Sequence, residues 1–99
     1  MPKHPTMAKA AAQYAKVIFE NDKVRVVDLK LKPGQKIPMH THSAYFTYAF
    51  NPFSYRSTSP DGKAKTRTAK AGEVSWYEAE SHAVDGLAKE GRVLVVELK

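Results

Sequence analysis

The sequence predicts an all-β domain, either a sandwich or a barrel, built from eight or nine short strands. Residues that favour turns recur at roughly 8–12-residue intervals along the chain. The runs between them are rich in Val, Ile and aromatic residues, and several alternate between apolar and polar side chains. No internal repeat or low-complexity tract is present. This combination is typical of a sandwich or barrel rather than of a helical or repeat protein.

Length and composition indicate one domain. The 99 residues, of which 42% are apolar, can form one hydrophobic core. Cysteine is absent, so a metal site must use histidine, carboxylate, hydroxyl or water ligands. The stretch from Ala8 to Ala12 is short and broken by Lys9, unlike a signal peptide, and no apolar run is long enough to span a membrane. We therefore expect a cytoplasmic protein with no membrane partner.

The formal net charge of +6 raises nucleic acid as a partner. The basic residues are spread along the chain, with one denser run at Lys63, Lys65, Arg67 and Lys70. Helix-turn-helix, aromatic RNA-binding and cysteine-finger patterns are all missing. The sequence therefore predicts no specific nucleic-acid binding.

Residues 1–16 are expected to form an N-terminal arm that contains a short helix. Pro2 and Pro5 favour a frayed start, and Thr6 could cap a helix over Ala8–Ala15. His4 lies in this arm, and we expect it to be exposed to solvent rather than to bind a metal.

The strands are expected to begin at Val17–Phe19, followed by a turn at Asn21-Asp22 and a strand over 24–32. The apolar positions of this second strand change phase near Val26–Val27, which predicts a bulge there. Further strands are expected at 37–42, 45–50, 53–58, 63–68, 74–77, 82–84 and 92–98, with a polar connection over 78–81 and turns at 33–34, 59–62, 71–72 and 85–86.

Three cations, Lys63, Lys65 and Arg67, fall on one face of an expected strand. The simpler interpretation is an edge strand kept soluble by its charge, and the alternative is an anion-binding surface.

The main chemical signal is His40-Thr41-His42. In an extended segment, side chains two residues apart point the same way, so this pair presents two imidazoles side by side. His82, forty residues further on, is the best third ligand. The sequence therefore predicts a three-histidine metal site on a β scaffold.

These residues resemble the motifs of a known family. Gly34, Pro38, His40 and His42 look like the first motif of the cupins, and the stretch from Gly72 to His82 is similar to the second. Residues 20–26 resemble the opening of small single-domain bacterial cupins, and the likeness covers about residues 17–98. The resemblance implies a cupin-type jelly roll, or double-stranded β-helix barrel, over 17–99. It also implies a metal inside the barrel mouth and frequent homodimerisation.

The chain departs from the family pattern in its acidic residues. Phe46 and Thr47 stand where the first motif carries a glutamate. Glu78 and Glu80 lie in the second motif, and either could be a fourth ligand or accept a hydrogen bond from an imidazole. Three neutral imidazoles favour a divalent transition metal, but Fe, Zn, Ni, Mn and Cu all accept them.

The sequence also indicates candidate pocket residues. One of Tyr45, Tyr48 and Trp76 could line the cavity and donate a hydrogen bond, whereas most aromatic residues of a barrel belong to its core or wall. Arg56 is the first choice to pair with an anionic substrate, although a salt bridge within the protein is an alternative.

Three interpretations of the function follow. The first is an enzyme that acts on a small molecule, an anion among the options, through dioxygenase-like oxidation or Lewis-acid chemistry. No general base is visible for such a reaction. The second is a non-catalytic cupin that binds or senses a small molecule or metal, and the third is a structural protein with an empty barrel.

Overall fold

The computed structural model describes residues 5–87 and 89–99, so the expectation for His4 lies outside the described residues. In chain order the elements are α1 (Met7–Ala10), β1 (Ala15–Glu20), β2 (Val24–Leu31), β3 (Lys36–His42), β4 (Tyr45–Ala49), β5 (Phe53–Thr58), β6 (Ala64–Ala69), β7 (Val74–Tyr77), β8 (Glu80–Gly86) and β9 (Gly91–Leu98). Over these ranges, no helix has the length and apolar character needed to cross a membrane.

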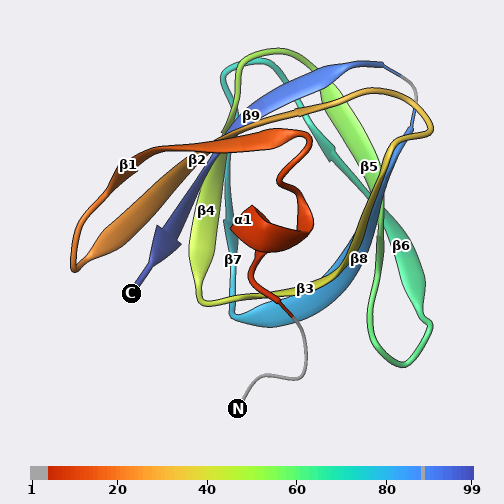
Figure 1. Ribbon diagram of the computed structural model, residues 1–99. Coiled ribbons are helices and arrows are strands. Elements are labelled where there is room, and N and C mark those ends of the chain that lie inside the picture. The colour runs from red at the N-terminus through yellow and green to blue at the C-terminus, as the bar shows by residue number, and fades with distance from the viewer. Residues whose placement is uncertain (1–4, 88) are drawn as a thin grey trace.

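The strands form two antiparallel sheets that face one another (Figure 1). One sheet has the order β1-β2-β9-β4-β7, and the other has the order β3-β8-β5-β6. Neighbours in each sheet are mostly distant in sequence, as in a jelly roll, where the chain passes repeatedly from one sheet to the other. The predicted all-β jelly-roll fold is confirmed.

The core lies between the sheets and follows from strand alternation. In β2, Val27, Leu29 and Leu31 are buried, and in β9 Val93 and Val95 are buried. Side chains two residues apart share a face, so these apolar series point to the interior, whereas Asp28 and Lys30 of β2 point the other way. Burial of each of these side chains stabilises the fold by about 1.5–3 kcal/mol.

The N-terminal segment is folded onto the barrel. Its helix is shorter than expected: α1 covers only Met7–Ala10 instead of Ala8–Ala15, and β1 already begins at Ala15. The Thr6 side chain makes no capping hydrogen bond. One helical turn lies between the two sheets (Figure 1), where Met7 and Ala11 are buried. Tertiary packing therefore decides the length of this helix, because a longer helix would displace strand pairing by β1.

Two predictions for the strands were wrong in detail. The bulge is in β1, not in β2: Val17 pairs with Val27 and Phe19 with Val26, so Ile18 is the extra residue. β2 keeps a continuous register with β9 and cannot hold the bulge.

The second error concerns β8, which starts at Glu80 and continues to Gly86. The polar connection expected over 78–81 is therefore shorter, and Asp85-Gly86 is not a turn. Pairing with β3 on one side and β5 on the other holds the polar ends of this strand extended.

Candidate metal centre

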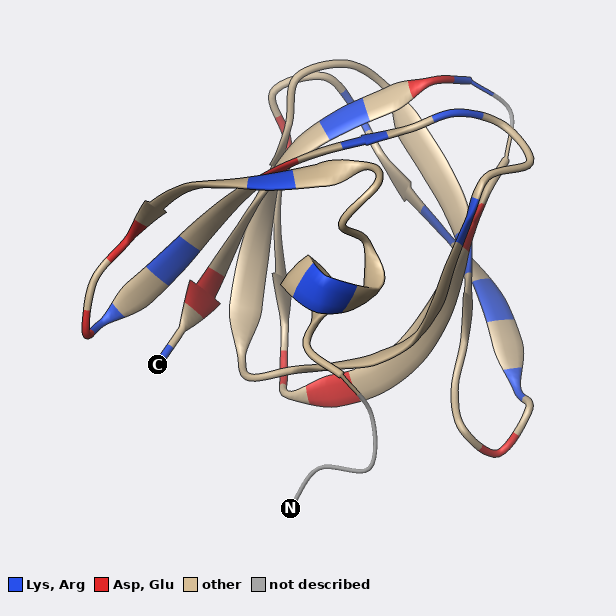
Figure 2. Cartoon of the chain, in the orientation of Figure 1, with Lys and Arg blue, Asp and Glu red and all other residues tan. Residues whose placement is uncertain are grey.

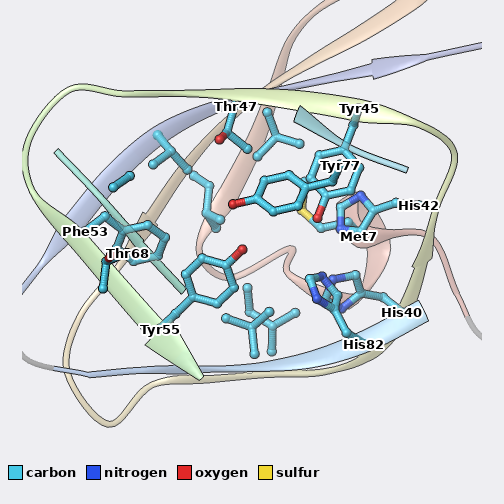
Figure 3. Close-up of a pocket in the computed structure, with 16 residues that line it drawn as sticks. Met7, His40, His42, Tyr45, Thr47, Phe53, Tyr55, Thr68, Tyr77 and His82 are labelled. Atoms are coloured by element: carbon cyan, nitrogen blue, oxygen red, sulfur yellow. The ribbon is translucent and has the colours of Figure 1, made fainter. Parts of the chain in front are cut away.

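Two neighbouring strands bring the three histidines together. His40 and His42 come from β3, and His82 on β8 is the direct cross-strand partner of His40. The β3–β8 register shifts between Ile37 and His40, so Ile37, His40 and His42 are all buried. The ring centroids are 4.7–5.2 Å apart. One candidate ligand atom from each histidine lies within 4.8 Å of the others (Figure 3).

Each histidine uses its Nδ1 atom in a contact with the protein. His40 Nδ1 lies 2.7 Å from the Pro38 carbonyl oxygen, and His42 Nδ1 lies 3.0 Å from a carboxylate oxygen of Glu97. Both oxygens accept, so these Nδ1 atoms carry the proton. His82 Nδ1 lies 2.8 Å from the Ser57 hydroxyl and 3.6 Å from Glu80, whose negative charge favours a proton on the same nitrogen. The described contacts thus use Nδ1 of each ring, which leaves Nε2 as the nitrogen available to a further ligand.

The protein environment keeps two of these rings neutral. Burial lowers the pKa of His40 to about 4 and that of His82 to about 3. In His40 the hydrogen bond to Pro38 opposes this shift, and in His82 the charge of Glu80 opposes it, but neither outweighs burial. At neutral pH both imidazoles are therefore uncharged, which is the form that binds metals.

Glu80 is the acidic residue of the second motif that reaches the centre. It accepts two hydrogen bonds from Arg67, each 2.8 Å long, and one of 2.5 Å from the Tyr45 hydroxyl. Burial alone would raise the pKa of Glu80, but these hydrogen bonds outweigh burial and lower it to about 2. Glu80 is thus an ionised residue beside His82 whose oxygens are already engaged. Glu78 lies elsewhere, where it accepts a hydrogen bond from the exposed Trp76 indole.

Sequence reasoning missed Glu97. This residue is only 4% exposed and lies on β9, opposite Tyr45 of β4 and Arg25 of β2. One of its oxygens contacts His42, and the other has no hydrogen bond and lies 3.6 Å from Arg25. A signal was available, because Glu97 continues the alternate buried series of Val93 and Val95. A charged residue on a buried face needs a partner, and here the partner is a histidine.

The histidines open onto a cavity of about 40 Å³ that is lined mainly by apolar and aromatic side chains (Figure 3). Tyr45, Tyr55 and Tyr77 form part of its wall, and Met7 of α1 contributes from the N-terminal segment. Burial raises the pKa of the Tyr45 and Tyr55 hydroxyls, which therefore stay protonated. Over the ranges described, no Asp, Glu, Lys or Arg side chain lines this cavity.

Three of the four candidate pocket residues lie outside the cavity. Tyr48 and Trp76 are 38% and 52% exposed, and Arg56 is also exposed. Strand alternation explains each error: the inward residues of these strands are Tyr45, Tyr77 and Tyr55, which are odd-numbered like their inward neighbours. Of the four candidates, only Tyr45 lies on the cavity wall.

The donor set fits a transition metal. Three buried imidazoles with free Nε2 atoms, two of them kept neutral by burial, match the chemistry of borderline divalent ions. The Nδ1 partners come from Pro38, Glu97 and Ser57 and restrict the orientation of the rings. His40, His42 and His82 are the residues that could hold such an ion.

No protein-family model matches the chain, and the search of curated proteins finds no relative. Solved structures do resemble it. A cupin domain from Bordetella pertussis Tohama I is 22% identical, with a TM-score of 0.78 over 100% of this chain and 99% of that one. A cupin-2 domain protein from Shewanella frigidimarina is 16% identical, with a TM-score of 0.60 over 86% of this chain and 79% of that one.

The formate complex of oxalate decarboxylase from Lactobacillus farciminis is also similar. It is 22% identical, with a TM-score of 0.58 over 78% of this chain and 24% of the longer enzyme. Likeness at these identities establishes the fold that the structures share.

Proposed function

We propose that this chain, which has the cupin fold, is a small metal-binding cupin that holds one divalent transition metal on His40, His42 and His82. The observation that carries the proposal is the use of all three Nδ1 atoms by the protein, which leaves three Nε2 atoms for one ion. A single buried histidine without a ligand would not require that its Nδ1 atom be held while its Nε2 atom stays available. Three from two adjacent strands, each with its own Nδ1 partner, argue for a common ligand.

The cavity beside the histidines, at about 40 Å³, has room for a group of only a few atoms next to the metal site. A divalent ion bound by three neutral imidazoles supplies Lewis-acid or O2-binding chemistry and attracts anions. The chain's own residues exclude bulk water with apolar side chains and present phenol groups at the wall. The Tyr45 ring stacks on His42, with centroids 4.1 Å apart, and its hydroxyl donates to Glu80. Tyr45 thereby holds the ring of His42 in place.

Catalysis and simple binding remain separate forms of this proposal. The likeness to oxalate decarboxylase, a structure solved with formate, supports a reaction on a small anionic molecule. The alternative is a non-catalytic cupin that binds or senses a small molecule or metal. This form is favoured by the absence of carboxylate or ammonium groups from the described cavity wall, which leaves no obvious general acid or base.

Metal analysis of protein purified without added metal tests the centre. We expect about one equivalent of a transition metal per chain, and none in the triple variant His40→Ala, His42→Ala, His82→Ala. Removal of the metal with a chelator should lower the melting temperature of the native protein only, because an ion bound by the folded state adds stability by mass action. A native protein that takes up no metal even after reconstitution would contradict the proposal.

Activity assays on the metal-loaded protein separate the two forms. Turnover or O2 uptake with a panel of small acids and thiols would support the enzyme. Saturable binding of a small molecule without any product would support the binding module. The triple histidine variant is the control in both assays, because a true signal must depend on the metal.

We also propose a homodimer. The large exposed apolar side chains lie on the five-stranded sheet or just after one of its strands: Val17, Ile18, Phe19, Tyr48, Phe50, Val74 and Trp76. An exposed apolar surface of this kind supports burial against a second copy. Light scattering on the purified protein tests the prediction, and a monomer at all concentrations would contradict it. The cytoplasmic location stays a prediction from the sequence.

A further inference from the structure

We propose that a groove between the β5–β6 hairpin and the start of β8 is a second binding site, which takes a small anion with a carboxylate or phosphate group. The groove has a volume of about 290 Å³. Its walls carry Ser57 and Ser59 of the hairpin, Lys63 just before β6, Lys65 and Arg67 of β6, and Glu80–His82 of β8. The inference does not depend on the metal centre.

The groove is distinct from the cavity beside the three histidines. The two share only His82 among their lining residues. Ser57 and Glu80 line the groove, and both lie close to His82 Nδ1, at 2.8 and 3.6 Å. The groove therefore lies on the Nδ1 side of the His82 ring, whereas the free Nε2 atom is the one available for a metal.

Two of the cations of the groove, Lys65 and Arg67, share one face of β6 by the register of the hairpin. Lys65 pairs with the buried Ser57, and Arg67 pairs with Tyr55 of the cavity wall. Strand alternation then places Lys65 and Arg67 on the same face of β6, the face that lines the groove. Lys65 is exposed and Arg67 is half-buried, and Thr66 between them is uncharged. If the charge served only to keep an edge strand soluble, the basic side chains would not need to lie on the face of β6 that lines the groove.

Two positive charges in the groove are not neutralised. Arg67 is paired with Glu80, but in the part of the chain that the structure describes neither Lys63 nor Lys65 forms an ion pair. Three cations against one carboxylate leave the lining with a net charge of +2. Asp61 is not among the lining residues, but its carboxylate contacts the Ser59 hydroxyl and the Lys63 backbone at the turn, so the net charge of +2 counts the lining residues alone. Figure 2 shows the basic residues along β6.

The size of the groove favours a small ligand. Its volume is at the lower end of the range of about 300–1,000 Å³ that small-molecule sites occupy. Two lysines, Lys63 and Lys65, line the groove. They favour a ligand with delocalised negative charge, because an ammonium group binds carboxylate or phosphate through charge-assisted hydrogen bonds. The Ser57 hydroxyl lies in the same groove and can add a neutral donor.

The test uses the full-length chain with its metal removed by a chelator. Inorganic phosphate and malonate are titrated separately at constant ionic strength against chloride, and binding is followed by amide chemical shifts. We expect saturable shifts at Ser57, Lys63, Lys65 and Ser81. The double variant Lys63→Gln, Lys65→Gln should bind roughly tenfold more weakly or worse. The matched control, Lys16→Gln with Lys70→Gln, removes the same charge outside the groove and should change the affinity by less than about twofold.

Each outcome of the titrations either supports or overturns the proposed anion site. Binding of phosphate alone, malonate alone or both identifies the preferred group and supports the site. No saturable shift with either anion overturns the proposal, as does equal weakening in the groove variant and in the control, which would indicate a general charge effect. Because the metal is absent throughout, a failure of the three-histidine centre to bind metal would leave this result unaffected.

Discussion

At the scale of single residues, the candidate centre depends on what lies behind each imidazole. Metal-binding histidines are oriented by the partner of the ring nitrogen that does not face the metal. Here these partners are a backbone carbonyl, a carboxylate and a hydroxyl. Among them, only the carboxylate of Glu97 adds negative charge through direct contact with a ring. The carboxylate of Glu97 on β9 thus lies close to the three histidines, whereas the first sequence motif carries no acidic residue at the expected position.

Replacement of Glu97 by glutamine tests this role. Glu97→Gln keeps the size of the side chain but removes the charge that stabilises the Nδ1 proton of His42, so we expect metal binding to weaken by about 10–100-fold. Competition with a chelating dye measures the change. Glu78→Gln is the matched control, because Glu78 accepts a hydrogen bond from the exposed Trp76 indole and is not among the residues described around the histidines. Equal affinities of the two variants would show that Glu97 has no influence on the centre.

The buried histidines also predict how stability depends on pH in the metal-free protein. The folded protein lowers the pKa of His40 to about 4 and of His82 to about 3, whereas both take up protons near pH 6.5 in the unfolded chain. Between pH 6.5 and 5 the unfolded state therefore binds more protons. The free energy of unfolding should fall as the pH falls, by up to about 1.4 kcal/mol per pH unit for each histidine.

Urea unfolding in the presence of a chelator at several pH values measures this slope. His82→Asn should reduce it by about half, since one of two titrating groups is gone. The same slope in the variant and the native protein would mean that His82 does not titrate differently in the folded state.

At the scale of the elements, the edge strand β6 pairs with β5, and side-chain contacts link it beyond β5 to β8 and to β7. Arg67 spans from β6 to Glu80 with two hydrogen bonds, and its guanidinium lies 4.6 Å from the Tyr77 ring centroid on β7. The pair is largely shielded from water, with side chains 13% and 21% exposed. The contact of Arg67 with Tyr77 links edge strands of the two sheets, β6 and β7, which the described sheet order does not join by backbone pairing.

The stability of this link is testable against a similar pair at the surface. Glu80→Gln should destabilise the protein by about 2 kcal/mol, because it leaves the shielded Arg67 without its counter-charge. Asp28→Asn breaks a comparable two-bond contact with Arg92, which is 46% exposed, and should cost less than about 1 kcal/mol. Denaturant unfolding measures both. Equal costs would show that shielding from water adds nothing to the Arg67–Glu80 pair.

At the scale of the whole molecule, the N-terminal segment is part of the barrel. Met7 is 1% exposed and lines the same cavity as the three histidines. The Thr41 backbone N–H donates to the Pro5 carbonyl, between the two histidines of β3 in sequence. A helix of one turn has no stability of its own, so this contact with the sheets holds it.

Shortening the Met7 side chain tests whether the N-terminal segment contributes to the core. Met7→Ala should lower the free energy of unfolding by about 2–4 kcal/mol, through lost burial and the cavity left behind. Lys9→Ala, in the same turn but exposed, is the control and should change it by less than about 0.5 kcal/mol. A Met7→Ala protein as stable as the control would show that the segment is docked too weakly to support the barrel.

The sequence by itself determined the features that depend on local periodicity. Alternation and turn residues predicted the all-β fold and nearly all strands, and the single residue between His40 and His42 was enough to place both on one face. Predictions from the sequence were wrong where tertiary contacts override the local preference of the residues. The polar start of β8 is held extended by two neighbouring strands, and the expected helix ends at Ala10, with turns over 11–14 before β1 begins at Ala15.

Only the tertiary structure decided which residues surround the histidines. Glu97 lies 55 residues from His42 in sequence, and Ser57 lies 25 residues from His82, so neither contact follows from local spacing. The sequence also did not decide which face of β4, β5 and β7 points inward. A shift of one residue exchanges the two faces of a strand, and in these strands both faces carry aromatic or polar side chains. Burial against the opposite sheet selects one face, and that choice depends on the packing of the whole barrel.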